Sequence, residues 1–485
     1  MKKILLLTLI IINSTLLLAQ REDATERIPQ KFYYSNNPTP PSSAFLSKVN
    51  VAPSECVSKE EQAEMWNLDQ EYIQSIRKDH PQLFHRSTGG NVLFEWPTRA
   101  KTGFNDYGYY TVNFLVDHNL QYPNLLLDYN CSNRTYDWAS GNHAGTDIIL
   151  WPYAWKRMDE QVMEVIAAAP GVIIAKIDGN YDRNCSNNGA GSWNAIHVMH
   201  ADGTVAWYLH FKTGSLTSKV VGDSVATGEY LGTAGSSGSS SWPHLHFQVL
   251  DQNGNVIDPW NGSCNNMNPG GVSRWANQQP YNVPYINRIC TKGTEVDWYN
   301  CPDPEFTLEK DTFNIGDSLW LWAYTRDMEN NSTMQINLFN PSNQNVINFP
   351  FTVPWATYAT TYVRWYYLVD SWWVPGWWKF QIVYDGNIFE HSFYMTGQTT
   401  SVNAESLAES MVIYPNPAKD VIEISGDNNI TSELTITDIQ GKVMLNTLLQ
   451  NNRMKLDISG YNNGVYFVEL HSDKGSRIQK LVVHH

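Results

Sequence analysis

Charged side chains are scarce in this sequence. They make up 17% of its 485 residues, and acidic residues outnumber basic ones by 48 to 33, which gives a net charge of −15. Proteins that bind nucleic acids neutralise phosphates with Lys and Arg, so this balance argues against a nucleic-acid partner. It also disfavours electrostatic docking to an anionic membrane surface.

Long apolar runs are missing after the first twenty residues. Residues 1–19 begin with Lys2 and Lys3, continue with an apolar run and end at the small residue Ala19, which is typical of a cleavable signal peptide. A membrane anchor is the alternative, but the polar triplet N-S-T at residues 13–15 interrupts the run. We therefore expect export through the periplasm and no transmembrane segment after signal cleavage.

Two common metal motifs are also absent. The six cysteines form no C-x-x-C pair, so a structural zinc knuckle is not expected. Without an H-E-x-x-H helix, proton transfer at a metal would fall to imidazoles rather than to a glutamate. An even number of cysteines in an exported chain predicts disulfides instead. The connectivity is open, and we expect Cys131 to pair with Cys185 because the two flank residues 141–148.

Two histidines stand in an alternating stretch at residues 241–250, S-W-P-H-L-H-F-Q-V-L. In a strand, every second residue shares a face, so His244, His246 and Gln248 point one way while the apolar residues between them point into the core. Two imidazoles on one face can bind one metal ion together, or one can bind it while the other transfers protons.

A histidine and a carboxylate lie four residues apart in G-N-H-A-G-T-D-I, residues 141–148. Catalytic zinc typically takes three ligands from His, Asp or Glu and leaves a fourth position for water. His143, Asp147 and one of His244 or His246 form such a set. His210, at the end of the predicted strand W-Y-L-H-F, is the remaining candidate for acid–base chemistry.

The combination resembles the lysostaphin/LytM family of zinc metallopeptidases. The H-x-x-x-D motif, the aromatic-x-H element and P-H-L-H-F occur in the order of that family, and the segments G-D-S-V-A-T-G and G-T-A-G-S-S-G match its glycine-rich segments before the final H-x-H. The resemblance covers roughly residues 135–260. It implies one Zn²⁺ held by His143, Asp147 and His246, with His210 and His244 as the catalytic histidines.

The other histidines occur singly or beside turns. We assign His197 and His200 to a hairpin strand rather than to a second metal site, and Asp202 to the turn that follows. The same structural interpretation applies to His80, His85, His118, His391, His471, His484 and His485.

Residues 58–80 predict one amphipathic helix. Ser58 and Glu61 form a capping box, and Pro81 marks the end. The apolar residues that recur at helical spacing are Met65, Leu68, Tyr72 and Ile76. We expect this helix to pack on the outside of the peptidase domain, with a pro-segment that covers the cleft as the alternative.

The last unit carries I-Y-P-N-P-A from residue 413, L-T-I-T-D-I-Q-G-K-V from residue 434 and K-L-V-V from residue 480. These segments resemble the C-terminal sorting domain of type IX secretion substrates in Bacteroidetes. The resemblance implies recognition by the type IX secretion machinery, passage through the outer membrane, and release or attachment at the cell surface.

We expect a mainly β protein: an antiparallel-sheet LytM-like peptidase domain with a short N-terminal helical segment, followed by two small β-sandwich domains. The tryptophans of residues 365–378 are expected to form sandwich core and interface, with a sugar-stacking or protein-binding platform as the alternative. The expected boundaries are 1–19 for the signal peptide, 20–90 for the N-terminal segment and candidate pro-region, 91–295 for the peptidase, 296–398 for the first sandwich, 399–410 for the linker and 411–485 for the sorting domain.

The two resemblances together imply a secreted zinc metalloendopeptidase. Members of the family typically cut glycine-containing peptides, so peptidoglycan cross-links are the first expected substrate. Two alternatives remain open: a protease on glycine-rich host or prey proteins, and a non-catalytic module that binds cell walls. All five family positions are filled, which favours the enzyme.

Overall fold

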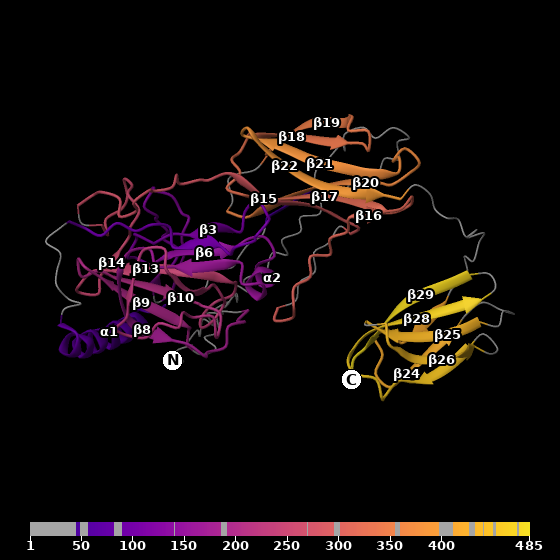
Figure 1. Cartoon of the computed structure of the whole chain (residues 1–485), viewed down its shortest axis with the longest axis horizontal. Helices are drawn as coiled ribbons and strands as arrows, with labels where there is room; N and C mark the ends of the chain where they lie inside the picture. The colour runs from indigo at the N-terminus through magenta and orange to yellow at the C-terminus, as the bar shows by residue number, and fades with distance from the viewer. Residues whose placement is uncertain are drawn as a thin grey trace, which may run out of the picture. The chain divides into compact units, whose positions relative to one another are not determined.

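The computed structural model describes residues 45–48, 57–81, 90–139, 141–185, 192–268, 270–294, 301–354, 359–396, 411–425, 432–439, 441–449, 453–472 and 475–485. Over these residues the fold is mainly β with largely antiparallel sheets, which confirms the predicted class. Two compact units, Met1–Gly397 and Gln398–His485, each have their own sheets (Figure 1). The predicted signal peptide, Cys56, His85 and the linker at 399–410 lie outside the described residues.

An eight-stranded antiparallel sheet forms the centre of the part that was predicted to be a peptidase domain, called the peptidase part below. Its order is β11–β8–β9–β10–β13–β6–β3, and β14 pairs with β13. The strands are β3 Tyr110–Phe114, β6 Thr146–Leu150, β8 Gly171–Ile177, β9 Ala195–His200, β10 Val205–Leu209, β11 Ser224–Val225, β13 His244–Leu250 and β14 Val256–Ile257. The alternation of β13 places Leu245, Phe247 and Val249 in a buried core, which leaves the opposite face for the histidines.

A three-stranded sheet closes the other side of this core. It consists of β2 Thr98–Ala100, β7 Met163–Ile166 and β12 Tyr230–Thr233, and its residues Met163, Val165 and Leu231 are buried against the central sheet. Two smaller elements complete the peptidase part: the pair β4 Asp137–Trp138 and β5 Gly141–Asn142, and the short helix α2 Ala154–Asp159.

Turn residues in the sequence predict two hairpins, one across Pro170 and Gly171 and one across Asp202 and Gly203, and the structure bears out the second of them. The turn at Asp202 and Gly203 does join neighbouring strands, β9 and β10, and Gly203 has the positive φ of +87° that the turn requires. The hairpin expected across Pro170 and Gly171 is wrong, because β7 and β8 belong to different sheets. Residues 167–169 are alanines buried between the two sheets, so the chain crosses the core there instead of turning back.

Helix α1, Lys59–Asp79, begins at the predicted capping box. The Ser58 hydroxyl accepts a hydrogen bond from the backbone N–H of Glu61, whose carboxylate accepts one from the N–H of Ser58. The buried face differs from the prediction, because Leu68 and Tyr72 are exposed whereas Met65, Asp69, Ile73 and Ile76 are buried. This face packs on Trp207 and Leu209 of β10, on the side of the central sheet that carries the histidines.

Two further sheets form a sandwich within the first unit, in the orders β1–β20–β17–β15 and β16–β22–β21–β18–β19. Their bounds are β1 Phe45–Lys48, β15 Tyr285–Lys292, β16 Thr312–Phe313, β17 Ser318–Arg326, β18 Thr333–Phe339, β19 Asn345–Thr352, β20 Thr361–Leu368, β21 Gly376–Tyr384 and β22 Asn387–Met395. The expected domain boundary between residues 295 and 296 therefore falls after a strand of this sandwich, since β15 pairs with β17. The polar, proline-rich residues 20–57 show no periodic apolar pattern and predict loose order, yet β1 lies within them and pairs with β20.

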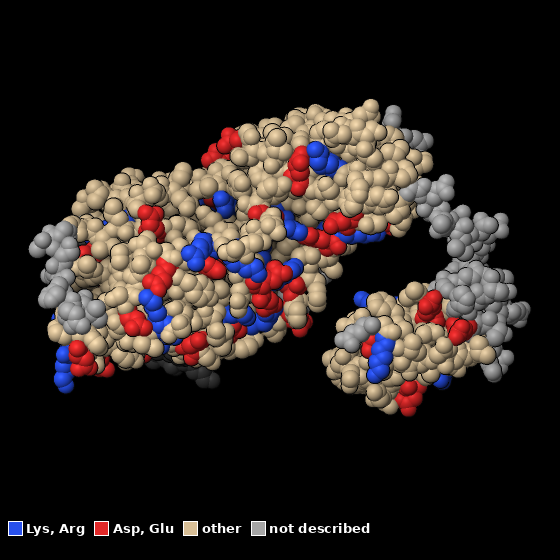
Figure 2. Space-filling view, in the orientation of Figure 1, with Lys and Arg blue, Asp and Glu red and all other residues tan. Residues whose placement is uncertain are grey.

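The aromatic residues of the sandwich are largely core. Trp365, Trp373 and Trp378 are buried, whereas Trp377 has 63% of its surface exposed. Other aromatic residues fill the interface with the peptidase part, where the Trp151 indole N–H donates to the backbone carbonyl of Thr325. On the face drawn in Figure 2, positive and negative side chains are interspersed over a surface made mostly of other residues.

The disulfides correct the predicted pairing. Cys131 is bonded to Cys264 and Cys185 to Cys301, whereas Cys290 is a buried free thiol. The first bridge joins segments that backbone hydrogen bonding already holds together, because the N–H of Cys264 donates to the carbonyl of Tyr129 over 3.0 Å. Proximity to the same motif in sequence was therefore a poor guide to proximity in space.

The second unit is a smaller β-structure with its own core, which includes Ile422, Ile436, Val468 and Leu481. Its sheets have the orders β23–β24–β27 and β26–β25–β28–β29. The strands are β23 Val412–Tyr414, β24 Val421–Ser425, β25 Ser432–Asp438, β26 Val443–Leu449, β27 Arg453–Asp457, β28 Gly464–Ser472 and β29 Gly475–Val483.

Candidate metal centre

Strand register brings three predicted ligands together. His246 on β13 lies opposite Asp147 on β6, and His143 lies just before β6. His143 Nε2 is 3.1 Å from Asp147 Oδ1, His246 Nδ1 is 2.9 Å from the same oxygen, and the two nitrogens are 3.2 Å apart. All three side chains are buried, and their ligand atoms lie within 4.8 Å of one another. The side chains therefore form a compact set of one carboxylate and two imidazoles.

The opposite nitrogen of each imidazole is occupied by an oxygen. His143 Nδ1 lies 2.7 Å from the carbonyl oxygen of Leu115, and His246 Nε2 lies 3.1 Å from Gln248 Oε1. Because these oxygens accept hydrogen bonds, the ring protons belong on those nitrogens, and His143 Nε2 and His246 Nδ1 keep their lone pairs. Two lone pairs and a carboxylate oxygen then face one another, an arrangement that a cation stabilises. The donor set fits zinc, which commonly binds nitrogen and carboxylate ligands.

The electrostatics favour an ionised Asp147. Burial by itself raises the pKa of this carboxyl, but the neighbouring histidines His143, His244 and His246 hold its pKa well below the usual range. Asp147 is thus suited to contribute negative charge at the centre.

His210 and His244 lie beside this cluster, with their ring centroids 4.4 Å apart. His244 Nε2 is 3.7 Å from Asp147 Oδ1. The Nδ1 atoms bond to backbone oxygens, that of His210 to Ser237 over 2.6 Å and that of His244 to Trp242 over 2.7 Å. Because carbonyls only accept, both Nδ1 atoms carry the proton and both Nε2 atoms are available as bases.

Burial lowers the pKa of both neighbouring histidines. The pKa of His210 lies well below the ordinary value because desolvation and the charges of His244 and His246 oppose protonation. Desolvation also lowers the pKa of His244, although Asp147 opposes the shift. Neutral imidazoles are therefore favoured at both positions, as a proton acceptor requires.

Gly145 makes room for the ligand ring. A Cβ atom at this position would lie 2.6 Å from His246 Cε1 and 2.6 Å from its Nε2. The glycine between His143 and Asp147 therefore lets the His246 ring sit directly against the backbone, where any larger residue would displace it.

A chain of two amides leads from His246 to α1. Gln248 Oε1 accepts from His246, and Gln248 Nε2 donates to Gln62 Oε1 over 3.3 Å. Gln62 Nε2 donates in turn to the carbonyl of Gly254 over 3.4 Å. Alternation in the sequence predicts that Gln248 shares a strand face with the histidines, but it gives this residue no role. No sequence pattern predicts the contact of Gln62.

The histidines assigned to structure have other partners. His197 Nδ1 bonds to Asp69 Oδ1 over 2.7 Å, and His200 Nδ1 to the carbonyl of Pro170 over 2.9 Å. Asp202 accepts hydrogen bonds from Thr204 within its turn and also pairs with Arg274 at 3.0 Å. These side chains lie outside the cluster of three ligands.

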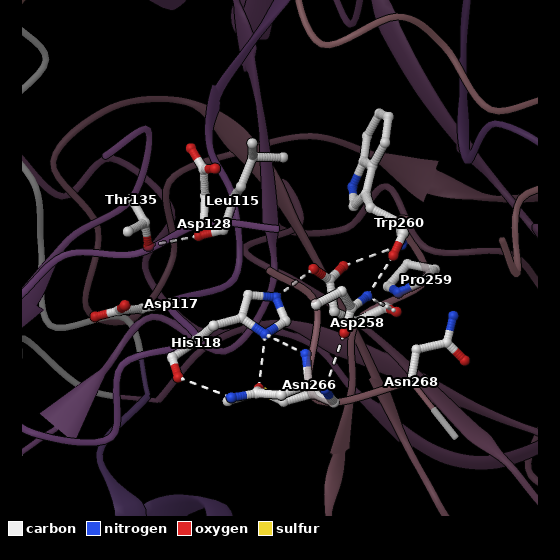
Figure 3. Close-up of polar contacts among 12 residues, drawn as sticks. Leu115, Asp117, His118, Asp128, Thr135, Asp258, Pro259, Trp260, Asn266 and Asn268 are labelled. Atoms are coloured by element: carbon white, nitrogen blue, oxygen red, sulfur yellow. Dashed lines mark hydrogen bonds and ion pairs between the residues drawn. The ribbon is translucent and has the colours of Figure 1, made fainter. Parts of the chain in front are cut away.

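His118 forms a second buried pair, shown in Figure 3. Its Nε2 is 2.7 Å from Asp258 Oδ2, and its Nδ1 is 2.9 Å from Asn266 Oδ1. Burial tends to lower the pKa of His118, but the hydrogen bond and charge of Asp258 raise it above the ordinary value. The pair fixes the loop after β3, whose Asp117 N–H donates to the carbonyl of His143 over 2.8 Å.

Comparison with known families matches two parts of the chain. Residues 143–259 match peptidase family M23, and residues 412–484 match the secretion system C-terminal sorting domain. The chain contains an M23 peptidase domain and a type IX sorting domain. The M23 domain supports a metallopeptidase, and the sorting domain indicates type IX secretion, to the medium or to the cell surface. Across the described residues, we find no helix with the length and hydropathy needed to cross a bilayer.

Several solved structures are similar to parts of the chain. The catalytic domain of the antimicrobial peptidase lysostaphin from Staphylococcus simulans is 27% identical over 31% of this chain and 89% of that chain, with a TM-score of 0.20. A mutant catalytic domain of the prophage-encoded M23 protein EnpA from Enterococcus faecalis is 18% identical over 36% of this chain and 95% of that chain, with a TM-score of 0.18. Bovine butyrophilin is 9% identical over 41% of this chain and 99% of that chain, with a TM-score of 0.16.

Proposed function

We propose that this protein is a secreted zinc metalloendopeptidase that hydrolyses glycine-containing peptides, with peptidoglycan cross-links as its first substrate. The observation that carries the proposal is the convergence of His143 Nε2, Asp147 Oδ1 and His246 Nδ1 beside two further buried histidines. The M23 match over the same residues supports the reaction class. The sorting domain supports a site of action outside the cell.

His143, Asp147 and His246 would hold the zinc ion. A bound zinc ion would lower the pKa of a water molecule towards about 7 and polarise the scissile carbonyl. Asp147 contributes the negative charge, and the hydrogen bonds to Leu115 and Gln248 fix the two rings with their lone pairs facing inward.

His210 and His244 would carry the proton chemistry. Both present an unprotonated Nε2, since the backbone oxygens of Ser237 and Trp242 hold the proton on Nδ1. We assign them to orienting the attacking water and accepting its proton on Nε2; the imidazolium formed in this way can then hydrogen-bond to the developing oxyanion and pass the proton to the leaving amine. Their lowered pKa values keep them neutral and ready to accept that proton.

The proposal is tested with the purified mature protein on purified peptidoglycan and on a panel of casein and elastin. We expect release of new amino groups from peptidoglycan, loss of that activity after treatment with a zinc chelator and its return when Zn²⁺ is added. If casein or elastin is cut and peptidoglycan is not, the substrate is a protein and the proposed peptidoglycan substrate is wrong. Absence of hydrolysis on every substrate with zinc bound would overturn the enzyme assignment in favour of a binding module.

A further inference from the structure

A cavity of about 510 Å³ lies between α1 and the loops next to the metal centre. One wall comes from α1 and its lead-in, and the opposite wall from the loop after β3 and from the hairpin between β13 and β14. His143 and Ala144 also line it, so the cavity reaches the backbone around a predicted metal ligand. Its wall on α1 lies outside the part of the chain that matches the M23 family.

The helical wall is firmly held. Asp69 of α1 accepts hydrogen bonds from His197 Nδ1 and from the Trp207 indole N–H, both over 2.7 Å, inside the protein. Trp66 packs so closely on Gly254 that a Cβ there would lie 2.8 Å from its ring. The cavity is therefore bounded by a helix that is part of the packed core.

The opposite wall is also fixed before any ligand binds. The His118–Asp258 pair anchors the loop that contributes Asp117 and Leu120 to the cavity (Figure 3). The N–H of Asp117 holds the carbonyl of His143. A ligand in the cavity would consequently meet two rigid surfaces, which reduces the entropy lost on binding.

The lining is mostly apolar, but the side chains of Lys59 and Asp117 add charge to it. Val57, Ala63, Trp66 and Met267 supply apolar surface, while Gln62 and Asn142 offer hydrogen-bonding groups. The volume of the cavity falls within the range of roughly 300–1,000 Å³ that is usual for ligand sites. A peptide made of glycine alone could not fill it, because glycine has no side chain.

We propose that this cavity is a substrate subsite that accepts a bulky apolar side chain of the peptide, near the scissile bond. The proposal rests on the peptidase function above. The cavity adds a second requirement to the preference for glycine. The substrate would have glycine at the scissile bond and a residue such as leucine or phenylalanine close to it.

The first test measures binding without cleavage. Metal-free protein is titrated by calorimetry with capped glycine pentapeptides in which one position at a time carries leucine or phenylalanine. We expect at least one of these peptides to bind about tenfold more tightly than the all-glycine peptide. Equal binding of the whole series would overturn the proposal, whether or not the protein is a peptidase.

The second test fills the cavity. Ala63 is an exposed residue of α1 that lines it, so Ala63→Trp, or the milder Ala63→Leu, should remove the gain in binding from the apolar residue. Gln74→Trp places the same side chain at an exposed position of α1 that does not line the cavity, and should retain the gain. Thermal unfolding of each variant shows that the helix is intact. A gain that survives both Ala63 substitutions in folded protein would refute the subsite.

Hydrolysis of the same peptides with zinc bound separates the two proposals. If the apolar residue raises kcat/KM about tenfold and Ala63→Trp removes that increase while cleavage of the all-glycine peptide persists, the subsite belongs to the peptidase. If no peptide is cut but binding still depends on Ala63, the proposed function fails and the cavity is a peptide-binding site without catalysis.

Discussion

His244 and His246 share one face of β13, but their second nitrogens have different partners. We predict that His246→Ala removes a metal ligand, so the variant is inactive and loses its zinc on dialysis. His244→Ala should retain zinc and lose hydrolysis by about 10²–10⁴-fold, because a proton acceptor is missing while three ligands remain. Elemental analysis beside the rate of hydrolysis checks both. A metal-free His244→Ala with a zinc-bound His246→Ala would reverse the two roles.

Gln248 and Gln62 act on the centre only through His246. We predict that Gln248→Leu weakens zinc binding by about 10-fold or more, because the ring of His246 loses the acceptor that fixes its orientation. Gln62→Ala should have the same effect to a smaller extent, because Gln62 contacts Gln248 and not His246. Competition with a chromophoric chelator measures the affinity.

Gln74 offers a matched control for Gln62. It is the same residue type on the same helix, exposed to solvent. Gln74→Ala should bind zinc as tightly as the unaltered protein. If Gln248→Leu, Gln62→Ala and Gln74→Ala all bind zinc equally, the hydrogen bonds through Gln248 and Gln62 have no influence on His246.

Sequence reasoning predicted the three residues that the structure brings together, His143, Asp147 and His246, but not the groups that hold their side chains in place. Spacing on a strand is enough to place His244 and His246 on one face, whereas His143 and Asp147 were singled out as a histidine and a carboxylate four residues apart. The choice of His246 over His244 as the ligand came from the family resemblance. Supports such as Leu115 act through a backbone carbonyl, which has no signature in the side-chain sequence. Gln62 lies more than 180 residues from its partner Gln248, so only tertiary folding brings the two together.

At the scale of elements, α1 shows where a periodic pattern misleads. Leu68 and Tyr72 fit the expected stripe yet are exposed, and the charged Asp69 is buried instead. A carboxylate enters the core because His197 and Trp207 offer it two hydrogen-bond donors. The existence of the helix and its capping box follow from local sequence, whereas its buried face depends on what the sheet presents.

Asp69 should therefore be important for stability. We predict that Asp69→Ala lowers the free energy of unfolding of the first unit by about 3 kcal/mol, because His197 and the Trp207 indole are left without an acceptor in the core. Calorimetric unfolding measures the change. Asp79→Ala, at the exposed end of the same helix, should change stability by less than about 0.5 kcal/mol. Equal effects of the two substitutions would contradict the buried role.

The strands of the sandwich were expected from alternation, but their partners were not. β15 and β1 join the same sheet as β17 and β20, although they come from opposite sides of the peptidase domain in sequence. Alternation reports which residues of a strand are buried and carries no information on which strand lies next to it. The crossing at Pro170 escaped prediction for the same reason.

At the scale of the whole molecule, the division between Gly397 and Gln398 suggests an independent sorting domain. We predict that a chain ending at residue 398 folds and hydrolyses peptides at the rate of the full chain, since each unit has a separate core. Circular dichroism and the peptide assay check this. Failure of the shortened chain to fold, or loss of its zinc-dependent activity, would show that the second unit contributes to the peptidase.

The segment before the peptidase domain belongs to two structures at once, since β1 pairs with the sandwich and α1 packs on the central sheet. A maturation protease that removed the exported chain up to residue 79 would therefore take the edge strand β1 from the sandwich and, with α1, uncover buried residues of the central sheet. The described parts of the candidate pro-region, β1 and α1, are thus built into the packed structure, and we expect the processed amino terminus of the secreted protein to precede Phe45.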